Sequence, residues 1–475
     1  MAGDFDEYVL MTVAVASHLT PDLRAEDIVR AKQLLPQHEA RFRVFSDGMQ
    51  TQTPVPKYGY YRASNGDVFA SHFFAYSALA AIPYIFFEKI GVAPTESFYI
   101  LNLACIFILG LCLYKFFGVA WKAALGLLLF SLCGGLNYFL WSSPECMSAA
   151  FLLSGLILFS LEAPIIAGLL IGLASTQNPP IVFALGFAPL FKALISTNLE
   201  ESLLTRLKAA LSKRMLLGIL LGTSLFLIPI GFNLWAFDVH SVIARDSTSF
   251  SLVSWVRLHS YFFDLSQGMV IGLLGIWLGL VWHLFAAPSK DKRRAVLFLI
   301  LASLLSCLFA FASLVAGNWN SAAIGMMRYA FWGAMPFLFV FLVFLREQIV
   351  LNRKLLFGCI LIQVSCVASA AQYRYLDHSP LAKLVFARSA SLYNPEPEIF
   401  VERTLHQDGI ALDKTAFYTF NYNGKPVKTL FHIENKNLDH QLCGDIRIVE
   451  RKLHSTNAGN GWFYLNGPLI CNRIN

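Results

Sequence analysis

Charged residues are scarce in this sequence. Asp, Glu, Lys and Arg make up 14% of the 475 residues, whereas 56% are hydrophobic, and the mean hydropathy is +0.56. A water-soluble globular chain carries about 25% charged residues, so this composition excludes that class and requires lipid as part of the solvent. The net charge of +7 does not indicate a nucleic-acid partner, because basic residues beside apolar segments are what membrane orientation requires.

Several familiar patterns are missing as well. The nine cysteines contain no CxxC pair and no Cys/His spacing typical of a zinc site. Met1 is followed directly by AGDFDEYVL, without the basic and apolar regions of a signal peptide. No internal repeat or low-complexity segment occurs. Cys443 and Cys471 lie in a polar tail and could form a disulfide if that tail is outside the cytoplasm.

Long apolar segments are what the sequence does contain. A bilayer-spanning helix needs about 20 apolar residues, and ten nearly uncharged segments approach or exceed that length. They are 72–87, 97–114, 123–144, 146–161, 163–191, 215–237, 268–288, 295–317, 329–345 and 355–373. We therefore expect an all-α polytopic membrane protein with about ten transmembrane helices. The helix at 163–191 should break or kink at Asn178-Pro179-Pro180, because proline removes a backbone donor.

Lys and Arg concentrate in three connections between these segments, 192–214, 288–294 and 346–354. The positive-inside rule assigns these connections to the cytoplasm. Counting back five segments from 192–214 places the amino terminus on the outer face, and counting forward places the carboxyl terminus there too. A break of 163–191 into two full spans would reverse the amino-terminal side.

The positions of the apolar segments divide the chain into three parts. Residues 1–71 form an outer-face region, in which Thr20-Pro21-Asp22 predicts the capped start of an interfacial helix. Residues 72–373 form the transmembrane domain. Residues 374–475 contain two Asn-Gly pairs and short β-prone runs, which predict a small extracytoplasmic β or α/β domain.

An acidic cluster, Asp4-Phe5-Asp6-Glu7-Tyr8, opens the chain. If a helix begins here, its positive end favours these carboxylates, and capping alone would account for them. The functional alternative is a general base that takes the proton of an acceptor hydroxyl while a second carboxylate steers the acceptor.

The Asp-Glu pair followed by Tyr resembles the GT-C superfamily of membrane glycosyltransferases, which take sugars from polyprenyl-phosphate lipids. Stretches similar to bacterial members occur at 65–87, 168–180, 317–336 and 393–403. The resemblance implies transfer of a sugar from such a carrier to a lipid, glycan or protein acceptor on the outer face of a bacterial inner membrane. In that superfamily a transmembrane helix precedes the acidic pair, so we expect that this sequence lacks the first helix.

The resemblance also implies roles for the acidic residues. Asp6 is expected to be the catalytic base, Glu7 a positioning or metal-contacting carboxylate, and Asp4 a second candidate for the base. A divalent metal is neither required nor excluded as a cofactor.

The donor phosphate needs cations at the outer surface. Arg328 suits this role best, because it opens an apolar segment at the outer boundary and a guanidinium can hold phosphate through two hydrogen bonds. The alternative for Arg328 is an anchor to lipid headgroups. Lys57, Arg62 and His72 are further candidates, and each could equally be ordinary surface charge.

Two other functions remain open. A transporter or flippase for a lipid or small solute is favoured by the proline-broken segment 163–191 and disfavoured by the lack of repeats and of charges within the spans. A non-catalytic membrane scaffold, whose outer tail binds a partner, is the third interpretation.

Overall fold

The chain forms two compact units. The computed structural model describes residues 4–51, 53–195, 201–286, 288–319, 325–347, 353–444, 447–448, 455–468 and 471–472. Unit 1 comprises Met1–Thr248, Ile276–Phe309 and Trp332–Leu356, and unit 2 comprises Ser249–Gly275, Ala310–Phe331 and Phe357–Asn475.

Apolar helices form the bundle of unit 1, and several of them continue into unit 2. They are α5 (Ser97–Phe117), α6 (Ala120–Phe130) continued by α7 (Leu136–Phe139), α8 (Glu145–Ser160), α9 (Pro164–Gln177), α10 (Phe183–Ile195), α12 (Lys213–Phe237), α15 (Val270–Ala286), α16 (Ser289–Leu314), α17 (Arg328–Gly333) continued by α18 (Met335–Arg346), and α19 (Arg353–Ala370). Among the described residues, six of these helices are long and apolar enough to cross a membrane, and four are shorter. The expected polytopic membrane protein with about ten spans is confirmed.

The proline-broken segment supplies two helices instead of one. Asn178, at the end of α9, donates a hydrogen bond of 2.8 Å to Ser148 in the first turn of α8. Lys192, near the end of α10, pairs at 2.6 Å with Glu162, which follows α8. Helix α10 therefore runs back beside α8, antiparallel to α9. The expected break is confirmed, but the assignment of 163–191 to a single span is wrong.

The expected span at 72–87 is also wrong. The helix formed there, α4 (Ala75–Ile90), buries Tyr76, Ser77 and Tyr84, and it packs against α1 (Phe5–His18). Near its carboxyl end, Glu88 forms an ion pair with Arg30 of α2 (Ala25–Leu34). Both ends of α4 therefore have partners at the same end of the bundle, while Ile82 and Phe86 on its other side stay exposed.

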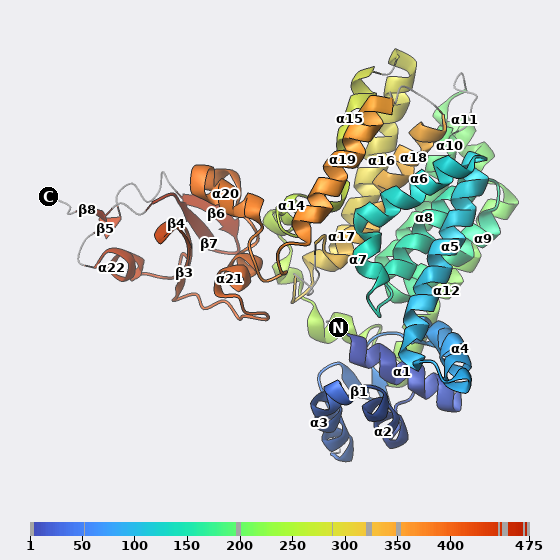
Figure 1. Cartoon of the computed structure of the whole chain (residues 1–475), viewed down its shortest axis with the longest axis horizontal. Helices are drawn as coiled ribbons and strands as arrows, with labels where there is room; N and C mark the ends of the chain where they lie inside the picture. Colours follow the sequence, from blue (N-terminus) through green and yellow to red (C-terminus); the bar gives the residue numbers. More distant parts are fainter. Residues whose placement is uncertain are drawn as a thin grey trace. The chain divides into compact units, whose positions relative to one another are not determined.

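The amino-terminal elements gather at one end of the unit 1 helices (Figure 1). They are α1, α2, α3 (Glu39–Gln50), α4 and a hairpin of β1 (Tyr60–Arg62) and β2 (Val68–Ala70). Tyr76 of α4 donates to Asn102 in the second turn of α5, which ties α4 to this end. The segment 72–87 drops out of the count of spans, and 163–191 adds one helix to it. The number of apolar helices before the connection 192–214 therefore stays at five.

The three basic connections border the opposite end of unit 1. Arg294 at the start of α16 binds Glu347 after α18, with one hydrogen bond of 3.2 Å. The guanidinium of Arg346 lies 4.6 Å from the ring centre of Phe116, in the last turn of α5. Asn102 and Phe116 are separated by about 20 Å along α5, at about 1.5 Å per residue. The basic connections and the amino-terminal elements are therefore at different ends of the bundle. The short helices α11 (Leu203–Ala210) and α13 (Val242–Ser247) complete the connections of this unit.

Helix α8 forms the centre of the unit 1 bundle. All its residues from Glu145 to Phe159 are buried, as expected of a helix that is apolar on every side. It contacts α5, α9 and α10, and α9 in turn packs along α12.

Unit 2 ends in a small domain of helices and strands. Its sheet has the order β3-β4-β7-β6, with every neighbouring pair antiparallel. Its elements are α20 (Pro380–Ser389), α21 (Pro397–Leu405), β3 (Phe417–Tyr422), β4 (Lys425–His432), α22 (Leu438–Cys443), β5 (Arg447–Ile448), β6 (Ser455–Gly459), β7 (Trp462–Asn466) and β8 (Cys471–Asn472).

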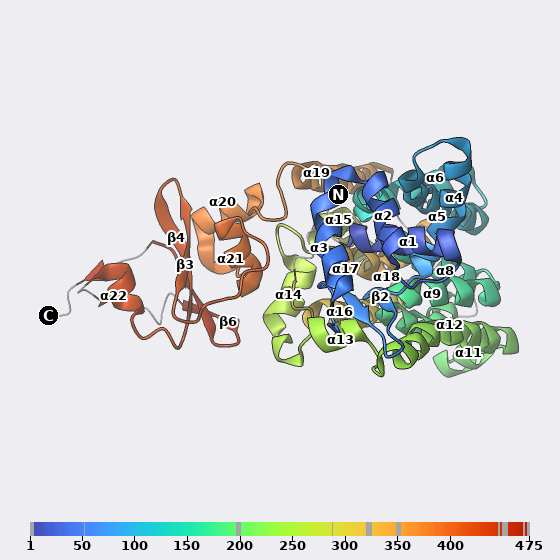
Figure 2. The same cartoon turned by 90° about the horizontal axis from the view of Figure 1, so that it is seen from below.

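The core of this domain lies between the sheet and helices α20 and α21 (Figure 2). Phe386, Phe400, Leu430 and Tyr464 form its centre. A disulfide joins Cys443 to Cys471, with the two Cα atoms 5.7 Å apart. The expected small mixed domain at the carboxyl end is confirmed.

Candidate functional site

The acidic cluster lies at the amino-terminal end of α1, and helix geometry divides it. Asp4 is the residue before the first turn, and Glu7 follows three positions later. Residues three apart share a face of a helix, whereas Asp6 and Glu7 are adjacent and point in different directions. The neighbouring carboxylates of the sequence therefore have different partners.

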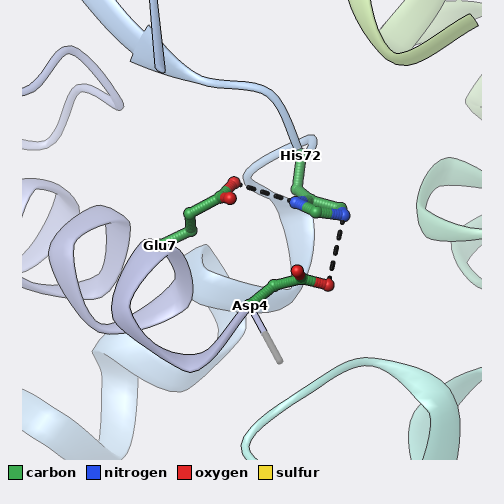
Figure 3. Close-up of side chains that lie close together, drawn as sticks. All are labelled: Asp4, Glu7 and His72. Atoms are coloured by element: carbon green, nitrogen blue, oxygen red, sulfur yellow. Dashed lines mark hydrogen bonds and ion pairs between the residues drawn. The ribbon is translucent and has the colours of Figure 1, made fainter. Parts of the chain in front are cut away.

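His72 lies between Asp4 and Glu7 (Figure 3). Its Nδ1 is 2.9 Å from Glu7 Oε2, and its Nε2 is 3.5 Å from Asp4 Oδ2. The β1–β2 hairpin delivers this histidine, since β2 ends at Ala70 and Ser71 then donates to the same Glu7 oxygen at 3.2 Å. The side chains of Asp4 and His72 are each 23% exposed, so solvent reaches the cluster.

Gly59 makes room for Glu7. Its φ is +89°, a conformation that suits glycine, and a Cβ placed there would lie 2.4 Å from Glu7 Oε1. Its carbonyl accepts a hydrogen bond of 2.8 Å from the Ser71 amide, which fixes the residue before His72. The loop before β1 thus shapes both sides of the cluster.

Burial raises the pKa of Glu7 above its ordinary value of 4.5, and the neighbouring charge and hydrogen bond of His72 oppose this rise. A carboxylate in such surroundings is a better proton acceptor than one in water. The cluster therefore has the properties of a general base with an imidazole partner.

Asp6 belongs to a second group of charges. Its oxygens lie 2.7 Å from His38 Nδ1 and 3.2 Å from Arg41 Nη1, and only 7% of the residue is exposed. Both partners come from the start of the α3 segment, about thirty positions along the chain. The sequence interpretation did not include His38 or Arg41, and nothing in their local pattern distinguishes them from surface residues.

Lys57 lies beside this second group. Its Nζ donates to the Arg41 carbonyl at 3.4 Å and lies 5.6 Å from the ring centre of Tyr60. Burial lowers the pKa of Lys57, and the charge of Asp6 opposes that change. Arg41 and Lys57 bring two cations to the single carboxylate of Asp6, an arrangement that can attract an anion.

Arg62 and Arg328, the other cations that the sequence offers as phosphate ligands, lie outside both groups of charges. Arg62 donates to four backbone carbonyls, those of Met49, Thr51, Thr53 and Gly66, and so holds the loop before β1 together. Arg328 begins α17 in unit 2, and its guanidinium is 5.4 Å from the ring centre of Tyr329. The Asp4–Glu7–His72 cluster is in unit 1, so Arg328 as a phosphate ligand stays a prediction.

A divalent cation fits the chemistry of the cluster. Asp4, Glu7 and His72 each offer one ligand atom, and these three atoms lie within 4.8 Å of one another. Two carboxylates and one imidazole are ligands that zinc, manganese and iron accept. His72 between two carboxylates suits a cation better than the phosphate expected from the sequence.

The stretch 393–403 has a structural role in unit 2. Arg403 donates to both oxygens of Asp264 at 2.9 and 3.0 Å, and Tyr393 donates to one of them at 2.5 Å. Arg257 of α14 (Trp255–Phe263) binds Glu396 at 3.2 Å. Buried ion pairs therefore attach α21 to the loop and helix near residue 260.

Comparison with known proteins found little. No protein-family model matches the sequence, and no curated protein matches it. Among solved structures the chain is similar to ArnT from Cupriavidus metallidurans in the apo state, with 13% identity and a TM-score of 0.40. The match covers 85% of this chain and 63% of the ArnT chain, so the chain spans less than two thirds of that protein. At this TM-score the likeness carries no argument about activity, and the fold defines the class alone, an integral membrane protein.

Proposed function

We propose that this protein is a membrane glycosyltransferase of the GT-C kind. It moves a sugar from a polyprenyl-phosphate carrier to a lipid, glycan or protein acceptor. The observation that carries the proposal is the solvent-reachable cluster of Asp4, Glu7 and His72 at the end of an apolar bundle opposite its basic connections. By the positive-inside rule, that end faces away from the cytoplasm.

In this mechanism Glu7 is the base. Its carboxylate takes the proton of the acceptor hydroxyl as that oxygen bonds to the sugar carbon, and the bond from this carbon to the phosphate oxygen breaks. The electron pair leaves with the polyprenyl phosphate. His72 orients Glu7, and Asp4 holds the other nitrogen of the ring. Glu7 is favoured over Asp6, because both oxygens of Asp6 already accept from His38 and Arg41.

The leaving phosphate gains negative charge and requires cations. Lys57 and Arg41 are the candidates in unit 1, because Arg41 pairs with Asp6 and the charges of both Asp6 and Glu7 act on Lys57. Arg328 is retained as a third candidate from the sequence. Arg62 is disfavoured, because its donors are engaged by backbone carbonyls.

The proposed location is a bacterial inner membrane, with both termini on the outer face. Residues 1–71 then form the outer active-site region and 374–475 an extracytoplasmic domain. The disulfide of Cys443 and Cys471 supports this assignment, because such bonds persist outside the reducing cytoplasm.

The rival interpretation as a transporter loses its main support. It depended on a helix broken inside the membrane at Asn178, whereas Asn178 lies between two complete helices and next to the first turn of α8. A scaffold would not need the converging groups around His72.

The test is transfer of a labelled sugar from a polyprenyl-phosphate donor by the purified protein in lipid. Glu7→Gln should lower the rate at least about 100-fold, the scale of a lost general base. Glu39→Gln, an exposed glutamate of α3, is the matched control and should act like the unaltered protein. If Asp6→Asn abolishes transfer and Glu7→Gln does not, Asp6 is the base; if neither variant affects transfer, the mechanism is wrong.

A further inference from the structure

A cavity of about 280 Å³ lies at the basic end of the unit 1 bundle, away from the proposed active site. It is lined by Phe116, Ile195, Val343, Arg346 and Glu347. The helices α5, α10 and α18 contribute these residues from their last turns or just beyond them. Three walls are apolar and one edge is charged, which is the pattern of an amphiphile site.

The charges at this cavity do not cancel. Glu347 is engaged by Arg294, which donates to both of its oxygens. Within the described part of the chain, Arg346 forms no ion pair with a carboxylate, and its contact is the face of Phe116 at 4.6 Å. An exposed positive charge is therefore left at the edge of an apolar cavity.

We propose that this cavity binds the headgroup of an anionic phospholipid. Arg346 binds the phosphate, and the apolar side chains contact the glycerol and the first methylene groups. Ligand pockets begin at about 300 Å³, so the cavity is too small for a whole lipid and leaves the acyl chains in the bilayer. Basic pockets between transmembrane helices at the cytoplasmic side are suited to such headgroups.

The location of the cavity adds support. It joins the ends of three apolar helices beside the connections 192–214, 288–294 and 346–354, where the sequence is most basic. A bound phosphate there would offset repulsion among these cations, so the lipid should stabilise the bundle. This proposal does not depend on sugar transfer, because binding is measured without donor or acceptor.

The test uses the full-length protein, delipidated in a neutral detergent. Its unfolding temperature is measured against added phosphatidylglycerol, phosphatidylcholine or inorganic phosphate. Phosphatidylglycerol should raise the temperature at a saturating concentration, and the other two should not. An equal rise with phosphatidylcholine would contradict the preference for an anionic lipid, and an equal rise with inorganic phosphate would make the site one for free phosphate.

Two variants and a control distinguish binding in this cavity from general electrostatic attraction between anionic lipid and the basic residues nearby. Arg346→Ala should weaken apparent phosphatidylglycerol binding about tenfold, as expected for the loss of one charged hydrogen-bonding partner. Ile195→Trp keeps the charge but fills the cavity, and it should have a similar effect. Arg293→Ala removes an exposed cation of the same end outside the cavity and should leave binding unchanged. If Arg346→Ala lowers stability equally with and without the lipid, Arg346 only stabilises the end of α18 and the proposal fails.

Discussion

Asp4, Asp6 and Glu7 are close neighbours in the sequence, and the structure gives them different partners. Asp4 and Glu7 meet His72, whereas Asp6 meets His38 and Arg41. The sequence could place carboxylates at a helix start, because that requires only local propensity and the helix dipole. It could not place His72, which is 65 positions from Glu7.

The buried charges around Arg257 in unit 2 give a prediction at the residue scale. Arg257 is 1% exposed and contacts two carboxylates, Glu396 at 3.2 Å and Glu398 at 2.6 Å. Replacement of Arg257 by Ala should lower the free energy of unfolding by about 3–5 kcal/mol, because the buried carboxylate of Glu396 loses its cation and Glu398 loses a hydrogen-bond donor. Glu398→Gln should cost much less at neutral pH, since burial and the charge of Glu396 raise the pKa of Glu398 to about 9.

The pH dependence checks this assignment. The folded state holds a proton on Glu398 that the unfolded chain releases near its ordinary pKa of 4.5. The stabilisation is therefore complete below that pH and is lost as pH rises toward about 9. Unfolding temperatures across this range should decline less in Glu398→Gln than in the unaltered protein. Parallel curves for the two proteins would mean that Glu398 is ionised when folded.

At the scale of elements, the contact between α9 and α12 is made by glycine. A Cβ at Gly168 would lie 1.9 Å from the Gly218 carbonyl oxygen, and one at Gly218 would lie 2.1 Å from the Pro164 carbonyl oxygen. Gly172 and Gly222 approach each other similarly, four residues further along each helix. Spacing of small residues by four lets membrane helices touch through their backbones.

Gly218→Ala should therefore separate these helices. We expect a loss of about 1–3 kcal/mol, the cost of overpacking, measured as a lower unfolding temperature in detergent. Gly231→Ala in the same helix is the matched control, because a Cβ there meets no atom within 4 Å. Equal effects of the two changes would point to helix propensity in place of backbone contact.

The helices also show which sequence patterns were sufficient to predict secondary structure. Hydropathy identified the apolar helices, and Asn178-Pro179-Pro180 identified a helix end, because both depend on residues close in sequence. Hydropathy misassigned α4, because an apolar helix face packs equally well against α1 or against lipid. The position of α1 in the fold, which the hydropathy of α4 does not contain, decides between packing against protein and contact with lipid.

At the scale of the whole molecule, the orientation in the membrane can be tested directly. In a background without reactive cysteines, Ser64→Cys lies in the exposed β1–β2 turn and Lys208→Cys lies on exposed α11. We expect an impermeant maleimide added to intact cells or spheroplasts to label position 64. Position 208 should react only after the membrane is opened. The reverse pattern would put the acidic cluster in the cytoplasm and remove the proposed transfer reaction.

The sequence by itself determined the membrane class, the approximate number of spans and the clustering of basic connections. These follow from composition and from the short-range cost of placing charge or unpaired backbone groups in lipid. Only the tertiary structure decided that Glu7 and Asp4 share His72, that Arg41 joins Asp6, and that α4 packs against α1. Each of these depends on which distant segments pack together, and apolar packing and charge pairing do not specify their partners from one segment alone.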